Sequence, residues 1–281
     1  MLSYRHAFHA GNFADVLKHT VLVSLVQSLC RKEKPFFYLD THSGIGRYDL
    51  SAAIAEKTGE WRAGIGRLWQ CDTVPTSVAI YLEAVRALNA SGKLKDYPGS
   101  PRVVRQLLRT KDRMWLCERH PRDIETLKAE FMRDKQVKVA FEDGFQAVKA
   151  QLPPKERRGL VLIDPSYEIK SDYKKVVEVM KQGYRRFATG LYAIWYPVVN
   201  RQTVDRLWKD VTASGVERAI VAEQSILPDG AGGMTGSGMI VINPPWQFDE
   251  QMAEVLPWLN NQLSDEGEGS FQLEWLVGSA D

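Results

Sequence analysis

The second half of the chain alternates between short apolar runs and amphipathic stretches. In the amphipathic stretches the apolar residues recur every three or four positions, which is the spacing of one face of a helix. The run "GLVLID" shows no polar alternation, as expected of a strand buried on both faces. We predict strands at 113–118, 137–143, 159–164, 190–197, 217–226 and 236–246. Helices between most of them indicate a doubly wound, mostly parallel sheet.

The first half adds one strand and a helical segment. An amphipathic helix is predicted over 15–32, and "PFFYLDTHSGIGRY" (35–48) is typical of a strand that ends in a glycine-containing turn. From 49 to 97 the pattern is helical, with no convincing strand, so we predict a helical insertion there. The last two strands follow each other without a helix and should form an antiparallel hairpin. The expected architecture is one α/β domain, residues 1–281, with a seven-stranded sheet that contains one antiparallel strand.

Composition narrows the class of protein only a little. The chain has 281 residues and a formal net charge of +2, which permits a nucleic-acid partner without arguing for one. Its 3 cysteines are far apart and form no CxxC pair, so neither a disulfide framework nor a zinc site is expected. The N-terminus lacks the apolar core of a signal peptide, and no apolar run approaches the roughly 20 residues of a membrane span. We expect a cytoplasmic protein.

Polar and glycine residues follow four successive predicted strands. They are "DTHSGIGRY" (40–48), Glu118, "EDGF" (142–145) and "DPSYE" (164–168). Each alone has a plain structural explanation, such as a turn or a salt-bridged residue. Ligands bind at the carboxyl ends of parallel strands, however, and here all four motifs meet. A glycine turn allows close approach, Glu118 can accept from both hydroxyls of a ribose, and Asp143 can accept from an adenine amino group.

Two tetrapeptides compete for the chemical step. "DPSY" (164–167) is one letter away from Asp-Pro-Pro-Tyr, which holds an amino group for methylation, and Ser166 takes the place of the second proline. "NPPW" (243–246) fits the [D/N]PP[Y/F/W] pattern better. It ends the strand that is expected to run antiparallel, so it should point away from the ligand edge. We interpret it as a strand end stopped by proline, with an anchoring tryptophan.

These motifs resemble those of S-adenosylmethionine-dependent adenine-N6 methyltransferases. The whole chain is similar to the bacterial 23S ribosomal RNA (adenine-2030-N6)-methyltransferase family, on essentially all 281 residues. The stretches that carry the resemblance are "YRHAFHAGNFADVLKH" (4–19), "YLDTHSGIGRYDL" (38–50), "GSP" (99–101), "CERHP" (117–121), "EDGF" and "DPSYE". The resemblance implies a Rossmann-like class I methyltransferase fold, S-adenosylmethionine as cofactor, and a single adenine of 23S ribosomal RNA as substrate.

The resemblance also assigns the cofactor site. It implies contacts from His19, His42, Ser100, Glu118, Asp143, Gly144 and Asp164, to which the glycine turn adds Gly44. The residue types themselves support only Glu118 and Asp143. Ser100 alone would be a helix cap before a proline at the first helical position, and a histidine placed like His19 usually just packs. The histidines of the chain are joined by no cysteine or carboxylate at ligand spacing, so no metal is expected.

The catalytic residues are expected to be Asp164, Pro165 and Tyr167. The Asp164 carboxylate and the Pro165 carbonyl would each accept one hydrogen of N6, and Tyr167 would offer an aromatic face to the base. Whether Asp164 also removes a proton is left open. The base must be flipped or unpaired to reach such a site. Contacts to the base or its phosphate are expected from Tyr4, His6 and Lys18.

Several alternatives stay open. The same tetrapeptide would suit a DNA adenine or a protein glutamine methyltransferase, and Ser166 gives some weight to a catalytically weak or silent RNA-binding protein. The arginines at 102, 105, 109 and 113 are candidates for RNA backbone contact or, equally, for a solvated helix face. We expect a metal-free monomer that acts on protein-free 23S ribosomal RNA or an early assembly intermediate.

Overall fold

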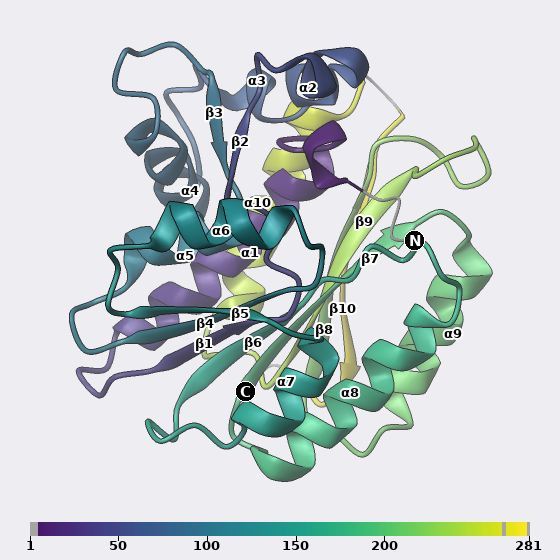
Figure 1. The fold of residues 1–281 in the computed structure, drawn as a ribbon. Coiled ribbons are helices and arrows are strands. Elements are labelled where there is room, and N and C mark those ends of the chain that lie inside the picture. The colour runs from purple at the N-terminus through teal and green to yellow at the C-terminus, as the bar shows by residue number, and fades with distance from the viewer. Residues whose placement is uncertain (1–4, 266–267, 280–281) are drawn as a thin grey trace.

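The computed structural model describes residues 5–265 and 268–279. Its centre is a twisted sheet of eight strands in the order β10-β8-β9-β7-β6-β1-β4-β5 (Figure 1). The strands are β1 (Phe37–Asp40), β4 (Arg113–Glu118), β5 (Val137–Phe141), β6 (Gly159–Ile163), β7 (Leu191–Val198), β8 (Ala219–Ser225), β9 (Gly236–Ile242) and β10 (Ser270–Val277). Strands β5, β4, β1, β6 and β7 pair in parallel. The predicted Rossmann-like α/β class is confirmed.

The predicted strand number was one too low. β9 pairs antiparallel with β7 and β8, as expected of the hairpin, but β10 also pairs antiparallel with β8 and forms the sheet edge. The sheet therefore has eight strands and two reversed ones, where seven and one were predicted. β10 is exposed over much of its length, so its sequence lacks the apolar run that marks the central strands.

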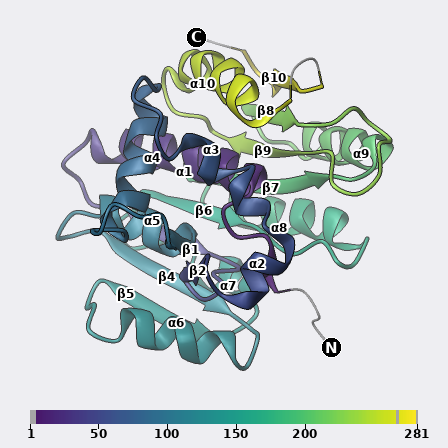
Figure 2. The same ribbon diagram turned by 90° about the horizontal axis from the view of Figure 1, so that it is seen from above.

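Helices cover both faces of the sheet (Figure 2). One layer contains α1 (Phe13–Cys30), α4 (Thr76–Ala87), α5 (Ser100–Leu107), α6 (Asp123–Phe131) and α10 (Phe248–Leu263). The other contains α7 (Gly144–Gln151), α8 (Asp172–Arg186) and α9 (Arg201–Thr212). α1 is long and apolar enough to cross a membrane by those two measures, but 83% of it is buried in the protein. It packs against α4, α5 and α10 as well as the sheet, so nearly all of its faces are apolar.

The segment between β1 and β4 departs from the prediction at its ends. It contains α2 (Ala53–Thr58), η2 (Glu60–Arg62), α3 (Ile65–Leu68) and α4, as the helical pattern indicates. Two short strands, β2 (Arg47–Asp49) and β3 (Asp96–Pro98), pair antiparallel and close its base, although no strand was predicted there. Three residues are too few to show a strand period.

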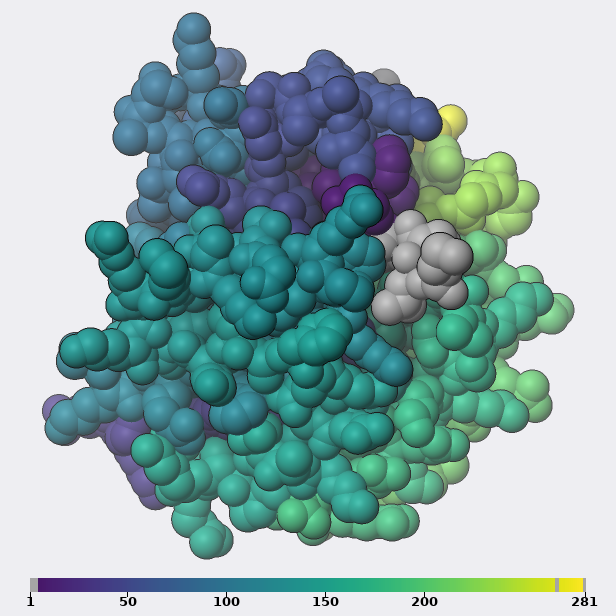
Figure 3. Space-filling view, in the orientation of Figure 1, coloured from purple at the N-terminus to yellow at the C-terminus, as the bar shows by residue number. Residues whose placement is uncertain are grey.

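The N-terminal segment, residues 5–12, crosses from this insertion to the start of α1. It includes the short helix η1 (His6–Phe8). In the space-filling view the purple atoms of this end of the chain lie beside the blue atoms of the insertion, near the green atoms of the C-terminal half (Figure 3). The Ile65 amide of the insertion donates to the Gly11 carbonyl over 2.8 Å. The segment is thereby held beside the carboxyl edge of the sheet.

Candidate active site

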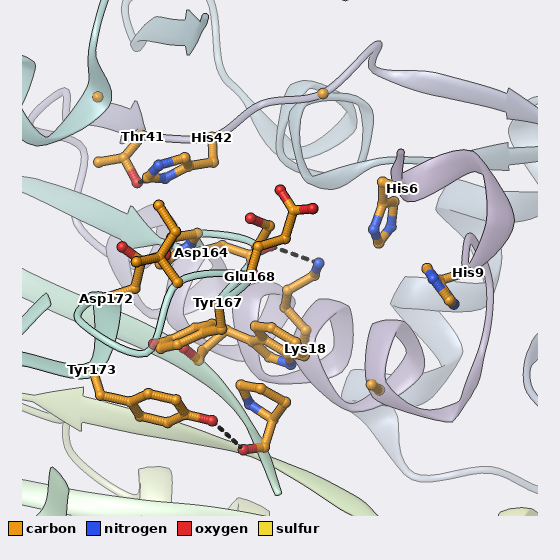
Figure 4. Close-up of a pocket in the computed structure, with 18 of the residues that line it drawn as sticks. His6, His9, Lys18, Thr41, His42, Asp164, Tyr167, Glu168, Asp172 and Tyr173 are labelled. Atoms are coloured by element: carbon orange, nitrogen blue, oxygen red, sulfur yellow. Dashed lines mark hydrogen bonds and ion pairs between the residues drawn. The ribbon is translucent and has the colours of Figure 1, made fainter. Parts of the chain in front are cut away.

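A cavity of about 1210 Å³ opens at the carboxyl ends of the parallel strands (Figure 4). Its walls come from the loops after β1, β4, β5, β6 and β7, from α1 and from the N-terminal segment. Every predicted site residue within the described ranges lines it: His6, Lys18, His19, His42, Gly44, Ser100, Glu118, Asp143, Gly144, Asp164, Pro165 and Tyr167. The remaining one, Tyr4, lies outside the described residues.

Asp40, the last residue of β1, holds the loop that follows this strand. This carboxylate is fully buried and accepts hydrogen bonds from the Tyr38 hydroxyl (2.8 Å) and the Ser100 hydroxyl (2.6 Å). Burial raises the pKa of Asp40. Gly99, not Ser100, is the N-cap of α5, so the predicted capping role of Ser100 is wrong. Its hydroxyl instead ties the start of α5 to the end of β1.

Glu118 lies across the glycine turn from β1. The Gly44 amide donates to its Oε2 (2.9 Å) and the His120 amide to its Oε1 (2.6 Å). Burial raises the pKa of Glu118. Each oxygen retains a second lone pair, so the carboxylate is oriented and can still accept from a diol. Gly44 has φ +59°, and a Cβ there would lie 2.2 Å from the Tyr48 hydroxyl, so this position requires glycine.

Asp143 and Gly144 begin α7. Asp143 caps the helix by accepting from the Phe145 amide (2.9 Å), and Arg119 lies 3.2 Å from its other oxygen. A Cβ on Gly144 would lie 1.8 Å from the Thr41 carbonyl oxygen. Only glycine lets the start of α7 approach the β1 loop this closely. The two loops form one continuous wall of the cavity.

His19 is buried and His42 is partly buried, and both histidines of the predicted cofactor site are neutral at physiological pH. His19 is 1% exposed, and its Nδ1 shares a 2.8 Å hydrogen bond with the Tyr97 hydroxyl. Burial lowers the pKa of His19 to about 3 and that of His42 to about 4. Within the described part of the chain, His19 Nε2 is buried and has no hydrogen-bond partner. A ligand atom in the cavity would satisfy it.

The histidines do not converge on a metal. His6 bonds Asp15 and His9 bonds Glu60, each over 2.9 Å, while His42 bonds the Thr41 hydroxyl over 2.8 Å. In residues 5–265 and 268–279, no group of three or more histidine, cysteine or acidic side chains is arranged to hold a metal ion.

Asp164 directly follows β6 and pairs with Lys18, which reaches it from α1 (Figure 4). The Lys18 ammonium lies 2.7 Å from Asp164 Oδ2 and 2.9 Å from Asp15 Oδ1. Burial raises the pKa of Asp164 to about 6, and Lys18 partly opposes this rise. Lys18 was predicted to contact the base or its phosphate, and this contact stays a prediction. Its buried ammonium is engaged by two carboxylates, and its pairing with Asp164 spans 146 positions, which no local pattern signals.

Tyr167 belongs to an aromatic wall of the cavity. Its hydroxyl donates to the Trp195 carbonyl (2.6 Å), and its ring centroid lies 5.8 Å from that of Trp195 and 4.5 Å from that of Tyr173. Tyr167 has φ +53°, which is rare for an aromatic residue, so the backbone changes direction sharply at this position after β6. Trp195 and Tyr173 were not predicted as site residues, because their sequence contexts indicate only a strand and a helix.

The rival tetrapeptide "NPPW" (243–246) lies at the end of the strands opposite the cavity, as predicted. Asn243 directly follows β9, and its side-chain amide donates to the carbonyls of Ala188 (2.7 Å) and Gly190 (2.8 Å), just before β7. Asn243 therefore holds a loop. The prediction that its tryptophan anchors the strand end is wrong, since Trp246 is 62% exposed.

The four arginines that were candidates for RNA contact are all ion-paired within the protein. The pairs are Arg102 with Glu130, Arg105 with Asp134, Arg109 with Asp112, and Arg113 with Glu156. None of the four lines the cavity. These ion pairs favour a structural role for the four arginines.

Comparisons with known proteins show the family of the chain. Two curated relatives, each called "Ribosomal RNA large subunit methyltransferase J", come from Escherichia coli K12 (52% identity) and Haemophilus influenzae (54%). Both alignments cover 99% of this chain and 99% of the relative. The crystal structure of a Legionella pneumophila protein superposes with a TM-score of 0.89 at 38% identity, over 95% of this chain and 98% of that one. The family model "Ribosomal RNA large subunit methyltransferase D, RlmJ" matches residues 33–277, and the chain belongs to that family.

Proposed function

We propose that this protein transfers a methyl group from S-adenosylmethionine to N6 of a single adenine in 23S ribosomal RNA. Family membership supports methyl transfer to large-subunit ribosomal RNA. The observation that carries the choice of acceptor is Asp164, an oriented carboxylate in the Asp-Pro-Ser-Tyr turn, which stands between the strand-end residues on one side and the aromatic wall on the other. We further propose a single domain, residues 1–281, with residues 49–97 as an insertion.

The residues around the cavity suit S-adenosylmethionine. Glu118 offers both oxygens to a ribose diol. The Asp143 oxygens accept from the Phe145 amide and from Arg119, and each keeps a second lone pair for an adenine amino group. Within the described residues, the buried Nε2 of His19 has no hydrogen-bond partner, and a polar atom of the cofactor would supply one. His42, Ser100, Gly44 and Gly144 complete the wall. When bound, the cofactor supplies an electrophilic methyl group on a sulfonium.

Asp164 and Pro165 would activate the amino group of the target. The N6 lone pair of adenine is delocalised into the ring, so N6 is a poor nucleophile. Lys18 occupies Oδ2 of Asp164 and leaves Oδ1 for one N6 hydrogen, while the Pro165 carbonyl takes the other. Two acceptors favour a pyramidal nitrogen with its lone pair directed at the methyl carbon. After it accepts the methyl group, N6 would lose one proton, to Asp164 or to solvent.

The aromatic wall suits a base that has left its helix. Tyr167, Trp195 and Tyr173 offer ring faces and edges beside Asp164. Stacking of this kind contributes about 1–3 kcal/mol per base in single-strand binding. We propose that the substrate is unpaired or flipped 23S ribosomal RNA, protein-free or in an early assembly intermediate, in the cytoplasm. The enzyme would act as a metal-free monomer.

The test is methyl incorporation from labelled cofactor into 23S ribosomal RNA from a strain that lacks the protein, followed by mapping of the product. Duplex DNA and a mixed protein substrate are offered in parallel. We expect one N6-methyladenosine in the RNA and no label in the other two. Asp164→Ala should abolish transfer while the melting temperature and the circular dichroism spectrum show an intact fold. Label in DNA or protein alone, or no transfer to any substrate, would replace this proposal by one of the alternatives.

A further inference from the structure

Asp15 is a buried carboxylate that the proposed chemistry does not yet use. It stands in the first turn of α1 with 2% of its side chain exposed. Its Oδ2 accepts from the Gly11 amide and contacts His6 Nε2, both at 2.9 Å, while its Oδ1 lies 2.9 Å from the Lys18 ammonium. The helix does not need it as a cap, because Asn12 accepts from the Asp15 amide (3.0 Å). Burial of a carboxylate is costly unless hydrogen bonds and ion pairs replace its lost hydration, and these three contacts do so.

One of the three contacts fixes Lys18. The ammonium lies one helical turn from Asp15, between the two carboxylates, and 5.7 Å from the centroid of the Trp195 ring. A lysine side chain has four rotatable bonds, so a single partner would leave the ammonium free to slide between both oxygens of Asp164. With Asp15 as its second partner, the ammonium stays on Oδ2. Oδ1 of Asp164 then remains open for the target.

The other two contacts fix the N-terminal segment. The Gly11 amide and the His6 ring are held to Asp15 from the side of α1. From the other side, Glu60 of the insertion contacts His9 (2.9 Å) and accepts from the Asn12 side-chain amide (3.0 Å). The segment is thus clamped at both edges, with His6 on the cavity wall (Figure 4).

We propose that Asp15 is a positioning residue for the methyl transfer, acting through Lys18 on Asp164 and through His6 on the cavity wall. This inference rests on the proposed function. The hydrogen bonds and ion pairs of Asp15 go to Gly11, His6 and Lys18, so its effect should appear in the turnover step and in the ionisation of Asp164. The groups that bias that ionisation are Lys18, His6 and Asp15, with the phenols of Tyr38 and Tyr167 nearby.

The sign of the effect follows from the charges. The Asp15 anion raises the pKa of Asp164, whereas Lys18 lowers it. Asp15→Asn removes the anion and leaves Lys18 to Asp164 alone, and both changes lower the pKa of Asp164. The acid limb of the pH–rate profile should therefore move to lower pH by about one unit. At pH 8, where Asp164 is ionised in both proteins, kcat should still fall by roughly tenfold or more, because the reacting groups tolerate little displacement.

Asp112→Asn is the matched control. Asp112 is also buried, also pairs with a cation three residues away (Arg109), and also accepts a backbone amide, that of Phe36 over 3.0 Å. It lies outside the cavity. Both variants should melt at lower temperature, but only Asp15→Asn should change kcat and shift the acid limb, with the KM for S-adenosylmethionine within about twofold of wild type in each.

Wild-type transfer to 23S ribosomal RNA is measured first, so failure of the proposed function is recognised before any variant is compared. A folded Asp15→Asn protein with wild-type kcat overturns the inference. So does a lower kcat with an unmoved acid limb, which would make Asp15 merely structural. If Asp15→Asn does not fold, Asp15→Glu decides, with Asp112→Glu as its control. The longer side chain displaces Lys18, so a kcat loss of threefold or more supports the inference and full kcat overturns it.

Discussion

Turnover should fall steeply below pH 6, because the proposed chemistry needs Asp164 as a carboxylate. Burial raises the pKa of Asp164 to about 6, although Lys18 lies 2.7 Å away and opposes the rise. Above that pH the carboxylate accepts the N6 hydrogen. Below it, a neutral carboxyl group accepts weakly and carries a proton of its own. About half of the enzyme is competent at pH 6 and about one tenth at pH 5, so kcat should drop roughly tenfold for each further unit.

The assay is steady-state methylation of the RNA from pH 5 to 8 with both substrates saturating. Saturation matters because burial also raises the pKa of Glu118, whose protonation would weaken cofactor binding and imitate the effect in kcat/KM. His19 and His42, with pKa values of about 3 and 4, do not titrate in this window. Lys18→Met should move the acid limb to higher pH, since the opposing cation is gone. A kcat that stays flat from pH 5 to 8, or a limb that moves with cofactor concentration, would refute the role given to the Asp164 carboxylate.

Three further substitutions test separate parts of the site. Glu118→Ala should weaken S-adenosylmethionine binding by about 1–3 kcal/mol, as for a lost hydrogen bond to a charged group, and calorimetry that finds unchanged affinity removes Glu118 from the site. Asn243→Ala should leave kcat near that of wild type and lower the melting temperature, because its two bonds to Ala188 and Gly190 are lost; loss of activity in a folded protein would restore the rival tetrapeptide. Ser166→Pro should raise kcat/KM about two- to fivefold if the roughly 0.4–1 kcal/mol of ordering acts on the productive turn; equal or lower activity would show that serine does not impair the site.

The sheet was predictable wherever its strands are buried on both faces. β6 is uniformly apolar and uniformly buried, so its sequence carries an unambiguous signal. The parallel order follows because helices alternate with such strands. β10 escaped prediction because an exposed edge strand needs no apolar run, and β2 and β3 are too short for a period. An apolar pattern arises in the sequence where a strand buries several side chains. β10 is largely exposed, and β2 and β3 are too short, so the sequence carries no signal for these three strands.

The candidate site also has a part that could be predicted from the sequence and a part that could not. Residues that directly follow parallel strands could be brought together from the sequence, since those strand ends share one edge. The ion pair of Asp164 with Lys18 could not be predicted, nor could the place of Trp195 beside Lys18, because these residues come from a helix and a strand distant in the chain. One signal was present, however. Asp15 and Lys18 stand three residues apart inside a helix whose other residues are mostly apolar, and two charges buried there are tolerable only if they are paired.

The charges around the cavity also explain what burial contributes to the proposed reaction. At neutral pH Asp15 and Asp164 are anionic and Lys18 is cationic, so the three together carry one net negative charge. Burial keeps His19 and His42 uncharged. Bound S-adenosylmethionine would bring a positive sulfonium, and the net negative charge of these three side chains would favour such a cation in the cavity. A second cation at either histidine would oppose it. The depressed pKa values of His19 and His42 would therefore favour binding of the proposed cofactor.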